Sequence, residues 1–268
     1  MLIPYLLVLA LVIVVVRYWL KRQHRARLLS SEMSPEDWAT ILRLVPIVAK
    51  LPSSLQTRLQ GKALLFLDQI DIYGRNGLVV TRDMELSLAA QARLLIVNST
   101  QWYDSLRTVL LYPGAFQSMQ SRQDGYLVTQ TKQVRLGESW HRGPVVLSWA
   151  HTLRGGEDPY DGHNLVLHEF AHQLDALSGS TDGVPVLMKG QGYADWEAAI
   201  VEGFSAHVEN VKRGRSTVLD PYAATKYVEF FAVCIEVFFE QPQGLKDEYP
   251  DVYHQMSLLL GLDPLDWD

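Results

Sequence analysis

The chain has 268 residues, of which 48% are hydrophobic and 20% charged, a composition typical of a folded globular protein and not of a disordered one. Its formal net charge of −6 at pH 7 gives no electrostatic basis for binding nucleic acid, so we expect no nucleic-acid partner. One cysteine, Cys234, excludes a disulfide within the chain and suits a reducing compartment.

An apolar segment opens the chain. Residues Met1 to Val16 carry no charged side chain, and the next four residues extend the run to the ~20 residues that a bilayer-spanning helix needs. Basic residues follow between Lys21 and Arg27, the reverse of the order in a cleavable signal peptide. By the positive-inside rule, we expect residues 1–20 to be a transmembrane helix and residues 21–33 a basic linker. This predicts a single-pass protein of the cell membrane with its catalytic domain in the cytoplasm; the alternative is a short peripheral anchor.

Residues 34–268 are expected to form one domain that begins with helices. The segment from Ser34 to Asp37 has an N-cap serine, a proline at the first helical position and acids in the first turn. Pro46 should end or kink this helix. Apolar periodicity predicts further helices at Leu55–Ile70 and Met84–Val97.

The pattern then changes to short strands. Leu106–Tyr112, Tyr126–Leu136 and Val145–Trp149 are rich in β-forming residues or alternate between apolar and polar side chains, with Pro-Gly and Gly-Pro breaks nearby. The remainder of the chain has mainly helical patterns. We therefore predict an α+β fold, with a small β-sheet between helical layers.

One predicted helix, Asn164–Ser178, carries the motif His168-Glu169-Phe170-Ala171-His172. Histidines at i and i+4 lie one turn apart on the same face, close enough to share one tetrahedral ion such as Zn²⁺. Glu169, between them in sequence, can reach a metal-bound water and act as general base in peptide hydrolysis. The alternative is a surface helix with two unrelated imidazoles.

A catalytic zinc site needs a third protein ligand and an open position. A later apolar helix offers two carboxylates, Glu229 and Glu236. Glu229 is followed by Phe230 and Phe231, so it is expected where that helix is buried, and a buried carboxylate is costly unless paired or coordinated. Glu236, two turns further on the same face, is the competing candidate. The alternative is that Glu236 is solvated or only contacts a metal ligand, and does not bind the metal itself.

Several motifs, in the same order, resemble those of the Mlc titration factor A family of zinc-dependent peptidases. They extend from about Ser34 to the C-terminus and include Tyr112-Pro113, Gly143 to Trp149, His163 to Asp175, Gly183-Val184-Pro185, Asp220 to Ala224 and Glu229 to Val233. The resemblance implies a zincin-like metallopeptidase domain, with His168, His172 and Glu229 as Zn²⁺ ligands and Glu169 as general base. It favours Glu229 over Glu236, and it suggests aminopeptidase activity.

Three further residues are candidates around this centre. A related toxin family, the lethal-factor-type metalloproteases, places a tyrosine seven residues before the ligand glutamate, and Tyr222 stands at that offset from Glu229. We therefore consider Tyr222 an oxyanion donor, the alternative being an ordinary half-buried tyrosine. Asp175 and Glu236 are expected just outside the metal ligands, where Asp175 would accept a hydrogen bond from a ligand imidazole and orient it or only cap local structure.

Two functions follow from this interpretation. The first is a membrane-tethered zinc peptidase that acts on a peptide or protein substrate. The second is a binding module, because titration factor A is named for capturing a transcriptional repressor of sugar uptake; a transcriptional regulator would then be the partner. The complete set of candidate zinc residues favours the enzyme.

Overall fold

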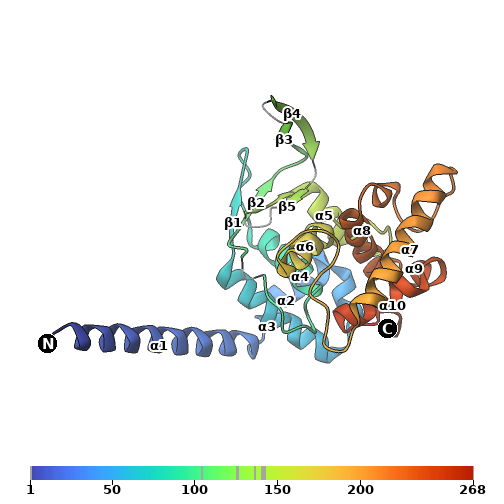
Figure 1. Ribbon diagram of the computed structural model, residues 1–268. Helices are drawn as coiled ribbons and strands as arrows, with labels where there is room; N and C mark the ends of the chain where they lie inside the picture. Colours follow the sequence, from blue (N-terminus) through green and yellow to red (C-terminus); the bar gives the residue numbers. More distant parts are fainter. Residues whose placement is uncertain (1, 104, 125–126, 136, 140–142, 268) are drawn as a thin grey trace.

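The chain is described here from a computed structural model (Figure 1). The model describes the backbone of residues 2–103, 105–124, 127–135, 137–139 and 143–267, and the side chains of these residues except 2–4, 6 and 116–139. The ends of the predicted strand at Tyr126 and Leu136 lie outside the described residues.

Helices make up most of the described chain. In chain order they are α1 (Leu2–Leu29), α2 (Pro35–Leu44), α3 (Ser53–Gln69), α4 (Arg82–Leu94), α5 (Trp149–Glu157), α6 (Leu165–Asp175), α7 (Tyr193–Lys212), α8 (Tyr227–Glu240), α9 (Pro242–Glu248) and α10 (Pro250–Leu260). Short 3₁₀ helices are η1 (Pro46–Lys50), η2 (Ala176–Ser178), η3 (Pro221–Ala224) and η4 (Pro264–Asp266).

The strands form one small sheet and one hairpin. The sheet has the order β1-β2-β6-β5, from β1 (Asp71–Gly74), β2 (Thr108–Tyr112), β6 (Val145–Ser148) and β5 (Gly137–Ser139). The first three strands are parallel, with Val109 opposite Val145, whereas β5 is antiparallel to β6. A separate antiparallel hairpin, β3 (Phe116–Asp124) and β4 (Leu127–Arg135), extends away from the sheet in Figure 1.

The predicted α+β fold was therefore wrong. The described chain is mostly helical, and its sheet is built around three parallel strands. Parallel pairing follows because α4 crosses over between β1 and β2, which returns the chain in the same direction. The continuous apolar run of β6, all of it buried, is typical of a strand covered on both faces.

Local sequence signals were more reliable. The Ser34 Oγ accepts a hydrogen bond from the Asp37 N–H at the start of α2, and α2 ends two residues before Pro46. α3 and α4 occupy the segments in which helices were predicted. β1 was not predicted; it is only four residues long and ends directly before a turn, where Asn76 has a positive φ.

The predicted transmembrane helix and membrane localisation were also wrong. None of the described helices is long and apolar enough to cross a membrane. α1 runs as one helix through Arg17 and the basic residues after it, so its charge-free part ends short of the ~20 residues required. The C-terminal end of α1 lies beside α3 (Figure 1). The His24 Nε2 there lies 2.9 Å from the Asp68 Oδ1. The basic residues from Lys21 to Arg27 thus lie within a helix that contacts α3.

α6 lies in the middle of the described fold, in contact with α4, α5 and α8. Its buried face is fixed by Phe170, whose ring lies 5.9 Å from that of Phe66 on α3 and 5.1 Å from that of Tyr103. Because this face is held by aromatic packing, the opposite face turns towards α8. That face carries the histidines of the sequence motif.

Candidate metal centre

The start of α6 is held by Asn164. Its Oδ1 accepts a hydrogen bond from the Leu167 N–H at 3.0 Å, as an N-cap does. Its Nδ2 donates to the Gly155 carbonyl of α5 at 2.8 Å. A Cβ atom at Gly155 would lie only 2.9 Å from the Asn164 Cα, so the glycine allows this close approach.

His168 and His172 lie one turn apart on α6 and face the same space. Their ring centroids are 4.9 Å apart and their planes are perpendicular. Glu229, in the first turn of α8, reaches both: its Oε2 lies 3.2 Å from the His168 Nε2 and 3.4 Å from the His172 Nε2. One ligand atom from each residue lies within 4.8 Å of the others.

These distances fit a tetrahedral ion. Ligands about 2.0–2.1 Å from zinc at tetrahedral angles lie roughly 3.3 Å from one another, close to the 3.2 and 3.4 Å observed here. Two imidazole nitrogens and one carboxylate oxygen are also a donor set that zinc takes in catalytic sites. The residues present therefore fit a bound metal, and they leave one position open.

Glu236 fixes the other side of the His168 ring. Its Oε1 lies 2.8 Å from the His168 Nδ1, and its Oε2 accepts a hydrogen bond from the Asn164 N–H at 2.6 Å. With Nδ1 protonated towards Glu236, the Nε2 lone pair of His168 points at the carboxylate of Glu229. Two acceptors in such contact need a cation between them, either a proton or a metal ion.

The charges around this pair agree with that requirement. Burial favours neutral His168, but Glu236 and Glu229 outweigh it and raise the pKa of the imidazole well above its usual value. Burial opposes ionisation of Glu229, but the hydrogen bonds from His168 and His172 outweigh it and hold the pKa of Glu229 well below its usual range. Without a metal, the site thus retains a proton in the position that a metal ion would take.

Glu169 lies beside these groups without sharing their hydrogen bonds. It is buried, and its Oε2 has no hydrogen-bond partner among the described residues. Burial raises the pKa of Glu169, although His168 and His172 act in the opposite direction. A carboxylate with a raised pKa and a free oxygen has the properties of a general base.

Tyr222 lies on η3, and its ring centroid is 6.1 Å from that of His168. The Asp220 carboxylate caps η3 by accepting from the Tyr222 N–H at 2.7 Å. Behind it, His207 is buried and its Nε2 lies 3.1 Å from the Asp220 carbonyl oxygen. Because burial lowers the pKa of His207, this ring is a neutral support of the segment that carries Tyr222.

Asp175 has a different position from the one its predicted role requires. Its Oδ2 accepts a hydrogen bond from the Gly183 N–H at 2.7 Å, and no imidazole donates to it among the described residues. Gly183 has φ of 88°, a conformation that favours glycine. Burial raises the pKa of Asp175 to about 6. The structure thus pairs Glu236, and not Asp175, with the imidazole of a candidate ligand, His168.

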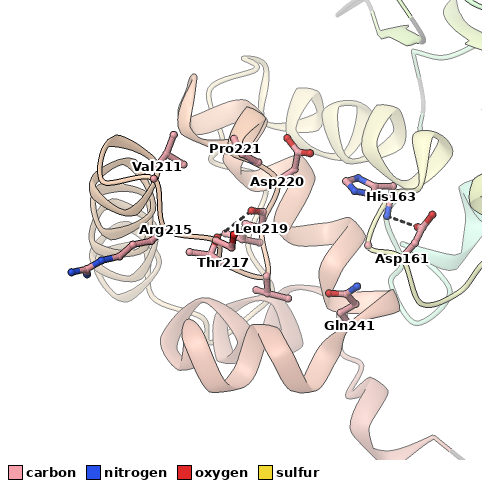
Figure 2. Close-up of a pocket in the computed structure, with 13 residues that line it drawn as sticks. Asp161, His163, Val211, Arg215, Thr217, Leu219, Asp220, Pro221 and Gln241 are labelled. Atoms are coloured by element: carbon pink, nitrogen blue, oxygen red, sulfur yellow. Dashed lines mark hydrogen bonds between the residues drawn. The ribbon is translucent and has the colours of Figure 1, made fainter.

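A cavity of about 490 Å³ lies beside the start of α6 and the segment before Tyr222. Figure 2 shows Asp161 and His163, which precede α6, on one side of it, and Asp220 and Leu219 across from them. Gln241, at the end of α8, closes a third side. This is the size of a small-molecule or side-chain pocket, although the candidate metal ligands do not line it.

Sequence reasoning missed two residues that connect α6 to α8. Asn164 marks the start of the predicted helix, and its N-cap role was readable from its position before an apolar run. Its contacts with Glu236 and with Glu240, a buried acid at the end of α8, join residues 72 and 76 positions apart. The spacing of Glu236 and Glu240 by one turn was the available signal.

Comparison with known proteins gives a consistent result. The family model of the glucose-regulated metallo-peptidase M90 matches residues 19–260. Mlc titration factor A of Yersinia pestis is 34% identical over 230 residues, covering 82% of this chain and 83% of the relative, and that of Yersinia pseudotuberculosis gives the same values. An uncharacterized protein of Synechocystis sp. is 36% identical over 270 residues, 98% of each chain. These matches confirm the resemblance predicted from the motifs.

Proposed function

Because the chain belongs to the glucose-regulated metallo-peptidase M90 family, we propose that it is a zinc-dependent peptidase whose metal is held by His168, His172 and Glu229. The observation that carries this proposal is the convergence of one ligand atom from each of these residues within 4.8 Å. Zinc, when bound, would polarise the scissile carbonyl and make a water molecule more acidic.

Glu169 is the general base in this proposal. Its unpartnered Oε2 accepts a proton from the attacking water and then gives that proton to the leaving amine. The raised pKa of Glu169 suits both transfers, since a base with a pKa nearer neutrality is also a better acid in the second step. Tyr222 donates a hydrogen bond to the oxygen on which negative charge develops.

The cavity of Figure 2 offers room for part of a peptide beside this centre. Its lining mixes apolar side chains such as Leu219 and Pro221 with polar ones such as His163 and Gln241, as substrate pockets do. We propose peptides as substrates, with cleavage at the amino end, as in an aminopeptidase.

The full-length protein tests this proposal in two measurements. Metal analysis of the purified chain should find about one zinc per chain, lost in His168→Ala. Reporter peptides with a free amino end should be cleaved, and Glu169→Gln should slow cleavage at least about 100-fold while zinc is retained. Glu197→Gln, a change at an exposed glutamate of α7, is the matched control.

The outcomes separate the parts of the proposal. Cleavage by Glu169→Gln at the rate of the unmodified chain would exclude Glu169 as the base. Equal cleavage of the same peptides with acetylated amino ends would exclude the aminopeptidase assignment and leave an endopeptidase.

A second candidate function is a binding module for a transcriptional regulator. It is favoured by the name of the relatives, Mlc titration factor A. Retention of a regulator of this kind by the immobilised chain, unchanged by Glu169→Gln and by chelator, would support binding as a separate role. Loss of retention on metal removal would tie the partner to the metal centre.

A further inference from the structure

Three carboxylates on one side of α8 face α6. Glu229, Glu236 and Glu240 follow one another at spacings of seven and four residues, which places them on the same side of the helix. Glu229 contacts both candidate ligand histidines, and Glu236 contacts His168. Glu240 contacts neither imidazole; its Oε1 accepts a hydrogen bond from the Asn164 Nδ2 at 3.1 Å.

Asn164 hydrogen-bonds to two of these carboxylates, Glu236 and Glu240. It donates through its backbone N–H to Glu236 and through its Nδ2 to Glu240 and Gly155, while its Oδ1 caps α6. Serine or aspartate would serve as an N-cap equally well. Only asparagine also provides amide donors, so the contacts with Glu240 and Gly155 explain the residue type found here.

From this geometry we propose that Asn164 and Glu240 are positioning residues for the metal centre. Glu240 holds Asn164, Asn164 holds the Oε2 of Glu236, and Glu236 in turn holds the His168 ring with its Nε2 towards Glu229. The inference rests on the proposed function, because it assigns these contacts to metal binding. Outer hydrogen bonds of this kind typically change metal affinity 10- to 100-fold.

The state of Glu240 supports this role. Its side chain is buried, with 4% of the residue exposed, and its Oε2 has no hydrogen-bond partner among the described residues. Burial raises the pKa of Glu240 to about 9, so the group is neutral at pH 7. A neutral carboxyl accepts from Asn164 without adding a second negative charge beside Glu236.

The test is zinc affinity, measured by competition with a chromogenic chelator on the full chain. Glu240→Leu should weaken zinc binding by about tenfold or more, and so should Asn164→Ser, which keeps an N-cap oxygen but removes the amide donors. Glu240→Gln should keep the zinc affinity of the unmodified chain, because an amide oxygen still accepts from Asn164. The double variant should cost no more than the larger single effect, since both residues act along one path. Bound Co²⁺ should show a changed visible spectrum in Glu240→Leu and an unchanged one in Glu240→Gln.

Gln255→Leu provides the matched control, because it removes a buried hydrogen-bonding side chain of α10 that contacts Gln191 and not α6. It should lower the melting temperature and leave zinc affinity unchanged. If Glu240→Leu and Asn164→Ser behave like this control, the two residues are only structural and the inference is overturned. If His168→Ala also binds zinc normally, the proposed metal site itself is wrong, which is a distinguishable result.

Discussion

Two groups of buried charge in this molecule are satisfied in different ways. The first, here called the carboxylate–imidazole cluster, lies between α6 and α8 and consists of His168, His172, Glu229 and Glu236. The second, here called the cation cluster, surrounds Trp102 with Arg25, Lys62 and Arg93. Both place ionisable groups in or near the core, but only the first is a candidate for chemistry.

The chain itself supplies the partners of the cation cluster. The Lys62 Nζ donates to the carbonyl oxygens of Ile96 and Ser99. The Arg25 guanidinium lies 3.7 Å from the centre of the Trp102 ring, and that of Arg93 lies 4.9 Å from it. Carbonyl oxygens and an aromatic face are suitable partners for buried cations.

The carboxylate–imidazole cluster, in contrast, brings acceptors together. Two Nε2 atoms point at one oxygen of Glu229, while Glu236 takes the only proton that an Nδ1-protonated His168 carries. A proton or the proposed metal ion would satisfy these acceptors, whereas the cation cluster is satisfied by carbonyl oxygens and an aromatic ring. Burial of charge alone therefore does not indicate a functional site. A better indication is the convergence of acceptor atoms that need a cation between them.

Glu240 lies next to the carboxylate–imidazole cluster, and its ionisation gives the largest expected effect on stability. Its pKa is raised from 4.5 to about 9 by burial, so between these values the folded chain holds a proton that the unfolded chain has lost. Stability is then fully present below pH 4.5 and falls as pH rises towards 9, by about 6 kcal/mol at most. Glu240→Gln removes this slope. Denaturant titrations of both chains from pH 5 to 9 should diverge steadily, and parallel curves would show that Glu240 is ionised.

Lys62 should show the opposite pH dependence. Burial, with Arg93, Arg25 and Arg58, lowers its pKa from 10.5 to about 8. Between pH 8 and 10.5 the unfolded chain therefore binds the extra proton, and stability rises with pH, by about 3 kcal/mol at most. Relative to Lys62→Met, the unmodified chain should gain stability over this range. The same titrations at alkaline pH measure it, and zinc affinity at pH 7 should not differ between the two chains.

Metal removal should affect the clusters unequally. Zinc at 100 times its Kd stabilises a folded chain by about 2.7 kcal/mol. Glu229→Gln should abolish this gain, because it removes the carboxylate that contacts both candidate ligand histidines. Lys62→Met should keep the gain in full. Melting temperatures with zinc and with chelator give the comparison. If zinc stabilises Glu229→Gln as much as the unmodified chain, the metal does not bind at the carboxylate–imidazole cluster.

The α6 helix shows what sequence could predict here. Its amphipathic pattern, its asparagine N-cap and the His168/His172 spacing are all local, and each corresponds to a feature of the structure. Glu229 was selected by the family resemblance, because spacing alone left Glu236 open. The roles of Glu236 and Asp175 depended on which side chains meet across 68 or 8 residues of chain, and no local pattern determines that.

The fold class was missed for a related reason. Whether short strands pair in parallel depends on the path of the chain between them, and α4 sets that path for β1 and β2. At the N-terminus the error was one of extent. The apolar run was extended across Arg17, whereas the helix that contains it continues to Leu29 and packs on α3.

Substitution of Tyr222 should have the smallest effect, a modest loss of activity, and it tests whether this tyrosine acts together with the carboxylate–imidazole cluster. Its residue is 51% exposed, so a hydrogen bond from it is worth less than one from a buried oxyanion donor. We expect Tyr222→Phe to lower kcat about tenfold, or ~1.4 kcal/mol, with zinc affinity unchanged. Tyr193→Phe, at another exposed tyrosine, is the control.

The ratio of kcat to KM effects decides its role. A donor that acts only on the developing charge lowers kcat and kcat/KM equally. A rise in KM alone would make Tyr222 a substrate contact, as expected of a ring beside the cavity wall at Asp220 and Pro221. Weaker zinc binding in Tyr222→Phe would instead add the tyrosine to the metal's surroundings. The carboxylate–imidazole cluster would then extend to η3, which Asp220 and His207 hold in place.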